Sequence, residues 1–172
     1  MRRKTLFVLT LLIVSCACTR TASTLAPRPS PTSEVRLCST ADLQTSSNSN
    51  GATGSIVLGV TLVNSSKSPC VLVGPPQVTL TVSGRPLDVQ IVRVDQASPS
   101  PTALTISPGE SAIVILIWRN YCGAALADGP SIQLALTTGQ TLDIKADVEA
   151  IPRCDAKNEP STLTVNPYSY PP

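Results

Sequence analysis

The sequence predicts an all-β fold. In several short stretches hydrophobic residues alternate with polar ones, 16 prolines and 9 glycines are spread along the chain, and only 14% of the residues are charged. Alternation with a period of two is typical of strands that bury one face, and frequent Pro and Gly mark turns. A hydrophobic content of 42% excludes a disordered polyelectrolyte and is sufficient for a packed core.

The clearest strand begins at Ser55. One face of this strand is aliphatic: Ile56, Leu58, Val60 and Leu62. A polar turn at residues 64–68 ends it, and Cys70 lies where the chain begins the next strand. Residues 41–49 offer a shorter, polar strand, and a turn-rich segment at 47–54 links the two. We expect these two strands to pair as a β-hairpin.

The chain continues as short strands separated by turns. Residues 111–121 are apolar on both faces, as in a central strand; a buried helix also fits such a run, but the density of Ile and Val favours a strand. After a strand at 87–91, residues 92–94 change parity, which indicates a bulge or a strand that passes between sheets. Pro108-Gly109 fits the centre of a type II turn. The other expected strands cover residues 77–83, 104–106, 132–136, 142–148 and 163–165.

About eight such strands without a helical stretch predict an immunoglobulin-like β-sandwich. We place this domain at residues 36–166 and expect residues 167–172 to form a proline-rich tail. The chain has a length that suits one domain with a core of its own.

The N-terminal segment resembles a bacterial export signal. Residues 2–4 are positively charged, and the apolar run that follows is too short to span a bilayer comfortably. The sequence Ile-Val-Ser-Cys at 13–16 resembles the lipobox of bacterial lipoproteins, whose cysteine receives diacylglycerol. We predict residues 1–15 as the signal peptide and Cys16 as the lipidation site. Cys18 fits less well, because a serine would stand where the motif has an aliphatic residue. An ordinary secretory signal or an uncleaved anchor is the alternative.

Residues 16–35 are rich in Ser, Thr and Pro and have no periodicity, so we expect a disordered tether. Two acyl chains would hold the protein at a membrane surface, outside the cytoplasm of a bacterial cell. The formal net charge is +2, and it falls to about −1 without the basic residues at 2–4. Nothing in this charge attracts nucleic acid, and no nucleic-acid partner is expected.

Four of the six cysteines lie in the predicted domain. An even set of cysteines in an exported chain indicates disulfides. Cys38 precedes the first strand of the predicted hairpin and Cys70 follows the second, so the hairpin brings them together. Cys122 ends the apolar strand and Cys154 follows the last hairpin, by the same logic. We predict the pairs Cys38–Cys70 and Cys122–Cys154. A four-cysteine metal site is not expected, because no Cys-x-x-Cys pair is present.

The residue types also exclude several chemistries. The sequence has no histidine, which excludes Ser-His-Asp and Cys-His catalysis and histidine-ligated metals. Lys67 lies in a Ser-Ser-Lys-Ser turn, without the Ser-x-x-Lys spacing of acyl-transfer enzymes. Asp143, Asp147 and Glu149 share one strand face, but Lys145 on the same face favours a solvated surface over a carboxylate pair or a calcium patch. We predict no catalytic residue, no metal and no cofactor.

Two further residues have both a structural and a functional interpretation. Trp118 is the single tryptophan, and we expect it to fill the core beside a disulfide; a stacking platform for a sugar is the alternative. Asn64-Ser-Ser matches a glycosylation sequon, which we interpret as a chance match in a bacterial lipoprotein.

Several spaced motifs together resemble a known family. They are Cys38 with Asp42-Leu43, Gly51-Ala52, Asn64, Cys70-Val-Leu-Val-Gly74-Pro75, Ile106-Ser-Pro108-Gly109, Trp118-Arg-Asn120-Tyr121-Cys122-Gly123 and Cys154. In this combination the chain from about Cys38 to Val165 resembles the domain of unknown function 4232 family. Tyr121 departs from the pattern, since many relatives have tryptophan there. The resemblance implies an extracytoplasmic, often lipid-anchored domain in bacteria, and it implies no activity.

The function expected from these observations is a non-enzymatic binding or adaptor domain, with an unknown protein or a cell-wall component as its partner. A structural accessory subunit of an envelope complex is the alternative, and it would expose an apolar patch on one sheet face. A hydrolase is the third and least supported reading.

The lipobox resemblance generates the first testable prediction. We expect the mature protein to begin at a diacylated Cys16, because the preceding Ile-Val-Ser is the pattern that the lipoprotein-processing enzymes recognise. Intact mass spectrometry of the protein from its own membrane checks this. Cys16→Ser should abolish the diacyl modification and Cys18→Ser should leave it intact; an unmodified Cys16 or an earlier N-terminus contradicts the prediction.

Overall fold

The computed structural model describes residues 36–52, 54–94, 103–126, 128–148 and 150–172. Among these residues there is one short 3-10 helix, η1 (Thr40–Asp42), and no α-helix. The strands are β1 (Leu43–Ala52), β2 (Ser55–Asn64), β3 (Cys70–Val73), β4 (Gln77–Val82), β5 (Arg85–Pro86), β6 (Gln90–Arg93), β7 (Ala103–Ile106), β8 (Ser111–Arg119), β9 (Ser131–Ala135), β10 (Thr141–Lys145) and β11 (Thr162–Val165). The all-β prediction is confirmed.

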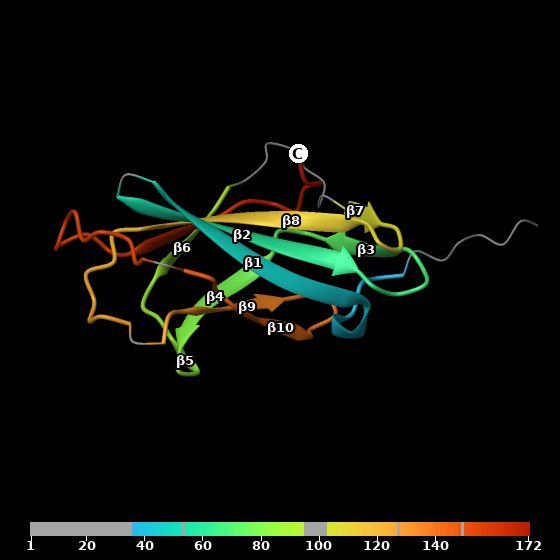
Figure 1. Cartoon of the computed structure of the whole chain (residues 1–172), viewed down its shortest axis with the longest axis horizontal. Coiled ribbons are helices and arrows are strands. Elements are labelled where there is room, and N and C mark those ends of the chain that lie inside the picture. The colour runs from blue at the N-terminus through green and yellow to red at the C-terminus, as the bar shows by residue number, and fades with distance from the viewer. Residues whose placement is uncertain (1–35, 53, 95–102, 127, 149) are drawn as a thin grey trace, which may run out of the picture. The chain divides into compact units, whose positions relative to one another are not determined.

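Two larger sheets contain most of the strands. One sheet has five strands in the order β1-β2-β8-β11-β6, and the other has four in the order β10-β9-β4-β5. Figure 1 shows β1, β2 and β8 in one layer and β4, β9 and β10 in another. Side chains from both sheets belong to one buried hydrophobic cluster, so the arrangement is β-sandwich-like.

A small third sheet consists of β3 and β7, which pair in antiparallel fashion. The segment before η1 adds to its edge. The N–H of Cys38 donates to the carbonyl oxygen of Val71 at 3.0 Å. The N–H of Val71 in turn donates to the carbonyl oxygen of Arg36 at 2.9 Å. Because β3 follows β2 and β7 precedes β8 in the chain, this sheet connects the end of β2 to the start of β8.

The core follows the alternation seen in the sequence. On β8, four residues are fully buried, at 0% exposure: Ala112, Val114, Leu116 and Trp118. The residues between them are partly exposed. The indole Nε1 of Trp118 donates a hydrogen bond of 2.9 Å to the hydroxyl of Ser161. Trp118 therefore lies in the core with its polar atom satisfied.

The expected hairpin of β1 and β2 is present, but its turn is shorter than predicted. The pairing runs without interruption from Leu43 opposite Asn64 to Ala52 opposite Ser55. Most of the segment 47–54, expected to be a turn-rich link, is therefore strand. Its Ser and Asn side chains are poor strand formers, yet the neighbouring strand supplies backbone partners at every position, and this tertiary pairing overrides local preference.

The expected return strand at 87–91 is wrong as a single element. β5 ends at Pro86 and pairs with β4, whereas β6 begins at Gln90 and pairs in parallel with β11 in the other sheet. The chain thus passes between the sheets, one of the two outcomes that the parity change indicates. The described residues form eleven strands and not the expected eight or so.

Residues 111–119 form a strand and not a helix, as the density of Ile and Val indicates. The turn before it also agrees with the sequence. Gly109 has a φ of +81°, and the N–H of Glu110 donates to the carbonyl oxygen of Ser107 at 2.9 Å, as a type II turn requires.

The expected tail at 167–172 packs on the domain. Tyr168 is only 5% exposed, and Ser169 exchanges two backbone hydrogen bonds with Ile113, of 2.8 and 3.1 Å. The hydroxyl of Tyr170 donates to the carbonyl oxygen of Thr105 at 2.7 Å. The prolines prevent a regular strand, but burial of an aromatic ring holds the segment in place.

The signal peptide at 1–15 and the tether at 16–35, including Cys16 and Cys18, lie outside the described residues. No helix within the described ranges is long and apolar enough to cross a membrane.

The burial of Trp118 generates the second prediction. Trp118→Ala should lower the free energy of unfolding by about 3 to 5 kcal/mol, because it leaves a large cavity. Ser161→Ala should lower it by about 1 to 3 kcal/mol, because it leaves no cavity of that size but removes the hydrogen-bond partner of the indole N–H and the bond to the carbonyl oxygen of Arg119. Urea denaturation measures both. A Trp118→Ala protein as stable as the wild type contradicts the core assignment.

Candidate functional site

The two disulfides join the predicted cysteine pairs, Cys38 with Cys70 and Cys122 with Cys154, with Cα–Cα distances of 4.9 and 4.7 Å. Each lies beside one end of the β2–β8 pair. Cys38–Cys70 is near the end of β2, and Cys122 follows the end of β8 closely. An asparagine accompanies each disulfide and organises the loop beside it.

Asn64, the last residue of β2, is fully buried and uses all of its polar atoms. Its Nδ2 donates to the carbonyl oxygens of Ser68 and Ile106, both at 2.9 Å. Its Oδ1 accepts hydrogen bonds from the N–H and the hydroxyl of Ser66, at 3.0 and 2.7 Å. The side chain therefore determines the shape of the polar turn at 64–68. At 0% exposure it is not accessible for glycosylation, which agrees with the interpretation of the sequon as a chance match.

Asp42 anchors the segment that carries Cys38. Its Oδ2 accepts hydrogen bonds from the N–H and hydroxyl of Ser39, at 2.8 and 2.6 Å, and from Nη1 of Arg36 at 2.8 Å. The hydrogen bonds from Ser39 and the Arg36 guanidinium lower the pKa of this carboxyl group from 3.8 to about 2, although burial opposes the shift. The carboxylate therefore stabilises the fold when it is charged.

Two other groups have shifted pKa values with local causes. The N–H of Ser107 donates to Oε2 of Glu110 at 2.8 Å and lowers the pKa of that carboxyl group. Burial raises the pKa of Tyr168 to about 12. Both belong to structural contacts, the turn before β8 and the packed C-terminal segment.

Asn120 organises the opposite end of the β2–β8 pair. It follows β8 directly and has a left-handed backbone, with a φ of +53°. Its Oδ1 accepts hydrogen bonds from the N–H groups of Asp155 and Ala156, at 3.0 and 2.9 Å. Its Nδ2 donates to the carbonyl oxygens of Ala156 and Glu159, both at 2.9 Å. One side chain thus holds the loop after Cys154 against the end of β8.

The aromatic residues next to Asn120 pack together. The ring of Tyr121 lies 5.2 Å from that of Trp118, with an interplanar angle of 60°. Its hydroxyl donates to the carbonyl oxygen of Ala124 at 3.0 Å. A Cβ atom at Gly123 would come within 2.6 Å of Cζ of Tyr121, so a side chain there would displace the ring. The motif from Trp118 to Gly123 therefore has a structural explanation. Trp118 fills the core and Asn120 holds the loop after Cys154. Tyr121 packs against Trp118, Cys122 forms the disulfide, and Gly123 leaves room for the ring of Tyr121.

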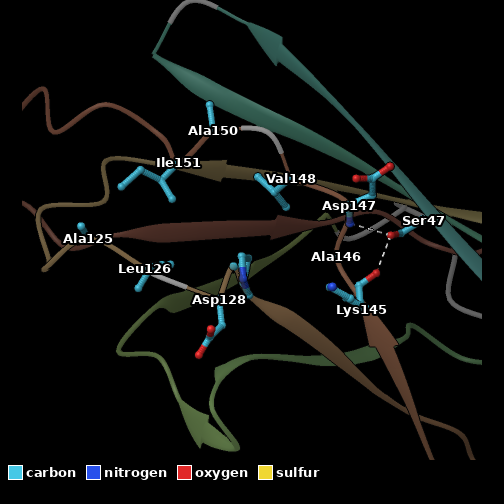
Figure 2. A pocket seen from close by; sticks show the side chains of 12 residues that line it. Ser47, Ala125, Leu126, Asp128, Lys145, Ala146, Asp147, Val148, Ala150 and Ile151 are labelled. Carbon is cyan, nitrogen blue, oxygen red and sulfur yellow. Dashed lines mark hydrogen bonds between the residues drawn. The ribbon is translucent and has the colours of Figure 1, made fainter.

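An open groove of about 730 Å³ lies beside this end of the fold (Figure 2). It is bounded by one residue of β1, by the segment before β9 and by the segment that continues from β10. Its lining residues are Ser47, Ala125, Leu126, Asp128, Gly129, Pro130, Lys145, Ala146, Asp147, Val148, Ala150 and Ile151. Leu126 and Val148 also pack against the core, so the groove has a fixed base.

Ser47 connects the edges of the two sheets at this groove. β1 and β10 are both edge strands. The hydroxyl of Ser47 donates to the carbonyl oxygen of Lys145 at 2.7 Å and accepts a hydrogen bond from the N–H of Asp147 at 3.0 Å, as Figure 2 shows. The carbonyl oxygen of Lys145 and the N–H of Asp147 are the groups with which a further strand would pair at this edge of β10. The side chain of Ser47 occupies both of them.

The groove has an apolar part and a charged part. Figure 2 shows Leu126, Val148 and Ile151 on one side, with Ile151 38% exposed. Asp147 and Lys145 lie on the side of Ser47, and Asp128 is drawn apart from them, nearer to Leu126. An apolar wall beside charged groups can bind a chain that carries both an aliphatic side chain and polar groups. Among the described residues no three His, Cys, Asp or Glu side chains group as metal ligands would.

The structure brings only some of the predicted residues to this groove. Lys145 and Asp147 line it, whereas Asp143 points elsewhere and accepts a hydrogen bond from Nε2 of Gln133 at 2.9 Å. Glu149 lies outside the described residues. Trp118 belongs to the core and not to the lining.

The apolar wall of the groove was not predicted. Leu126 and Ile151 lie outside all strands, and they show no periodicity that could identify them. The only signal in the sequence is their position, shortly after Cys122 and shortly before Cys154, in segments that the predicted disulfide would tie together.

Fold and site define a class of protein: an all-β domain with two disulfides and an open groove where the edges of two sheets meet. The chain belongs to the family described as domain of unknown function (DUF4232), whose sequence profile matches residues 38–169. The match includes the buried Tyr168. No curated protein and no solved structure matches the chain. Disulfides are typical of oxidising compartments, which is consistent with an extracytoplasmic location.

The low pKa of Asp42 generates the third prediction. Because the pKa is about 2 in the folded protein and 3.8 in its usual state, the unfolded chain binds more protons between these values. The stabilisation is complete above about pH 4 and is lost as the pH falls toward 2. Asp42→Asn should be less stable at neutral pH and should lose less stability over this range. Urea denaturation at several pH values measures this, with the exposed Asp143→Asn as control; equal pH dependence in Asp42→Asn and wild type contradicts it.

Proposed function

We propose that this protein is a binding or adaptor domain of the bacterial cell envelope, anchored to the membrane by diacylated Cys16 and displayed on the tether at 16–35, and that it catalyses no reaction. The groove beside β1 and β10 carries the proposal. It combines an apolar wall with charged groups, and it is built from irregular segments on a rigid pair of sheets, where binding residues are most often found.

We propose an immunoglobulin-like topology for the two larger sheets. Its support is the antiparallel pairing within most of the sandwich, together with a parallel edge pair of β6 and β11. In such sandwiches the segments at the ends of the sheets carry the binding residues.

The occupant that fits the groove is an extended segment of a protein partner. No aromatic residue is among the lining side chains, so there is no platform on which a sugar ring could stack. An aliphatic side chain of a peptide could instead contact Leu126, Val148 and Ile151. Its polar or basic neighbours would face Asp128 and Asp147.

A second candidate function, a structural subunit of an envelope complex, is favoured by a different surface. Val92 and Val94 are 42% and 44% exposed at the end of the edge strand β6. Val92 is in β6 and Val94 directly follows it, and two exposed aliphatic residues at a sheet edge are suited to packing against another protein.

Matched substitutions of these two surfaces give the fourth prediction. A photo-crosslinking amino acid is placed at 151 or at 94 in the lipidated protein in its own membrane, and the crosslinked partner is identified by mass spectrometry. We expect the partner to be captured from 151. With that partner purified, Ile151→Glu should weaken binding at least about tenfold, because it places a charge against the apolar contact.

Val94→Glu is the matched control, since both residues are aliphatic and similarly exposed, at 38% and 44%. Both variants should keep the wild-type stability in urea. Loss of binding only in Val94→Glu, or capture only from 94, would replace the groove by the edge of β6 and support the structural subunit. Turnover of a peptide or glycan by the purified protein would contradict the proposal as a whole.

A further inference from the structure

The two disulfides differ in their access to solvent. Cys38 and Cys70 are buried, at 2% and 1% exposure, whereas Cys122 and Cys154 are both exposed. Thiol–disulfide exchange needs direct attack of a thiolate on a sulfur atom, so access decides which disulfide reacts in the folded protein. A thiol can reach Cys122–Cys154 without unfolding, and it can reach Cys38–Cys70 only after the surrounding structure opens.

The exposed disulfide also joins the two segments that form the apolar wall of the groove, residues 123–126 and 150–153, called the wall segments below. Cys122 shortly precedes Ala125 and Leu126, and Cys154 shortly follows Ala150 and Ile151; all four of these neighbours line the groove, and Figure 2 shows them on its apolar side. The disulfide holds the Cα atoms of the two cysteines 4.7 Å apart. The segments between the cysteines and these lining residues contain no strand. The covalent bond is therefore a direct constraint on how the two wall segments lie against each other.

We propose that Cys122–Cys154 is a thiol–disulfide exchange site, and that its reduction by a dithiol protein loosens the two wall segments while the sandwich stays folded. The proposal rests on the groove being the binding site, but its chemistry does not depend on that function. The partner in this reaction is an extracytoplasmic protein with a pair of cysteines that cycles between dithiol and disulfide.

The exchange proceeds in two balanced steps. A thiolate of the dithiol attacks one sulfur of Cys122–Cys154, the bond between the two cysteines breaks, and the other cysteine leaves as a thiolate that takes up a proton. The second thiol of the partner then loses its proton and attacks the mixed disulfide, which releases the second cysteine as a thiol. The partner gives up two electrons and becomes a disulfide, and Cys122 and Cys154 become thiols.

Two oxygen atoms near Cys122 can accept a hydrogen bond from its thiol when the disulfide is reduced. Its Sγ lies 3.6 Å from Oδ1 of Asn120 and 3.7 Å from the carbonyl oxygen of Ala156. A thiol at this position has both oxygens as hydrogen-bond acceptors. Because the disulfide itself has no hydrogen to donate, these contacts become hydrogen bonds only on reduction.

Hydrogen bonds independent of the disulfide keep the rest of this end in place. Asn120 holds Asp155, Ala156 and Glu159, and the hydroxyl of Ser161 donates to the carbonyl oxygen of Arg119 at 3.1 Å. These contacts attach the loop after Cys154 to the end of β8. Reduction should therefore act on the wall segments 123–126 and 150–153 and leave β8 and β11 unchanged.

The fifth prediction tests the exchange. In the full chain in detergent, free thiols are blocked with N-ethylmaleimide, dithiothreitol is added under native conditions, and the new thiols are labelled with iodoacetamide at successive times. Peptide mapping should show Cys122 and Cys154 labelled about a hundredfold faster than Cys38 and Cys70. Reduction of both disulfides at one rate, or of Cys38–Cys70 first, or of neither, overturns the proposal.

The structural consequence has a separate readout that needs no ligand. Amide hydrogen exchange is compared between the oxidised wild type, the selectively reduced wild type and a Cys122→Ser/Cys154→Ser variant of the full chain. Exchange should rise about tenfold or more at 123–126 and 150–153 in both the reduced protein and the variant, and remain unchanged in β2 and β8. Equal exchange at the wall segments in all three, or a rise throughout β2 and β8, overturns the proposal.

The outcomes separate this inference from the proposed function. If the wall segments loosen on reduction but Ile151→Glu leaves partner binding intact, the exchange site stands and the groove is not the binding site. If Ile151→Glu abolishes binding while the disulfide resists dithiothreitol, the proposed function stands and the exchange site fails.

Discussion

The antiparallel pairing of β2 with β8 is the interaction on which the rest of the structure depends. It runs from Ser55 opposite Arg119 to Val63 opposite Ser111, and the inward residues of both strands are fully buried in the middle of the core. β1 and β11 pair with the outer edges of these two strands, so the whole five-stranded sheet is aligned on them. Neither strand can slip by one residue without exchanging its buried face for the partly exposed one, and this fixes the register.

The ends of this pair pose a different problem, because the chain must leave the sheet there without losing backbone hydrogen bonds. Asn64 and Asn120 solve it, since an amide side chain both donates and accepts. Asn64 bonds a carbonyl oxygen and an N–H of its own turn and a carbonyl oxygen of β7. Asn120 bonds the carbonyl and N–H groups of the loop that follows Cys154. A disulfide alone would restrict these loops but would leave their polar groups unsatisfied. The recurrence of an asparagine shortly before a cysteine therefore has a physical cause.

The sequence predicts most of this framework and little of the groove. Alternation identifies the strands with one buried face, such as β2, β4 and β9, and hairpin adjacency identifies the pairing of Cys38 with Cys70. Alternation fails at β1, whose polar residues become strand through pairing with β2. It also fails at residues 85–93, where the chain changes sheets. The roles of Asn64 and Asn120 depend on carbonyl groups distant in the sequence, such as that of Ile106. Leu126 and Ile151 have no periodic pattern, so only the folded chain shows that they line one groove.

The existence of the groove follows from how the sandwich is closed at this edge. Thr45, Ser47 and Ser49 occupy the partly buried face of β1, where small polar side chains cannot fill the space that aliphatic residues fill elsewhere in the core. Ser47 satisfies the edge of β10 with one hydroxyl, so the two sheets meet here through a side chain and not through a continuous ladder. The space beside this contact is bordered by irregular segments, which have no neighbouring strand to hold them. The Cys122–Cys154 bond joins two of these segments. Under the exchange proposed above, its reduction makes the groove adjustable while the β2–β8 framework stays rigid.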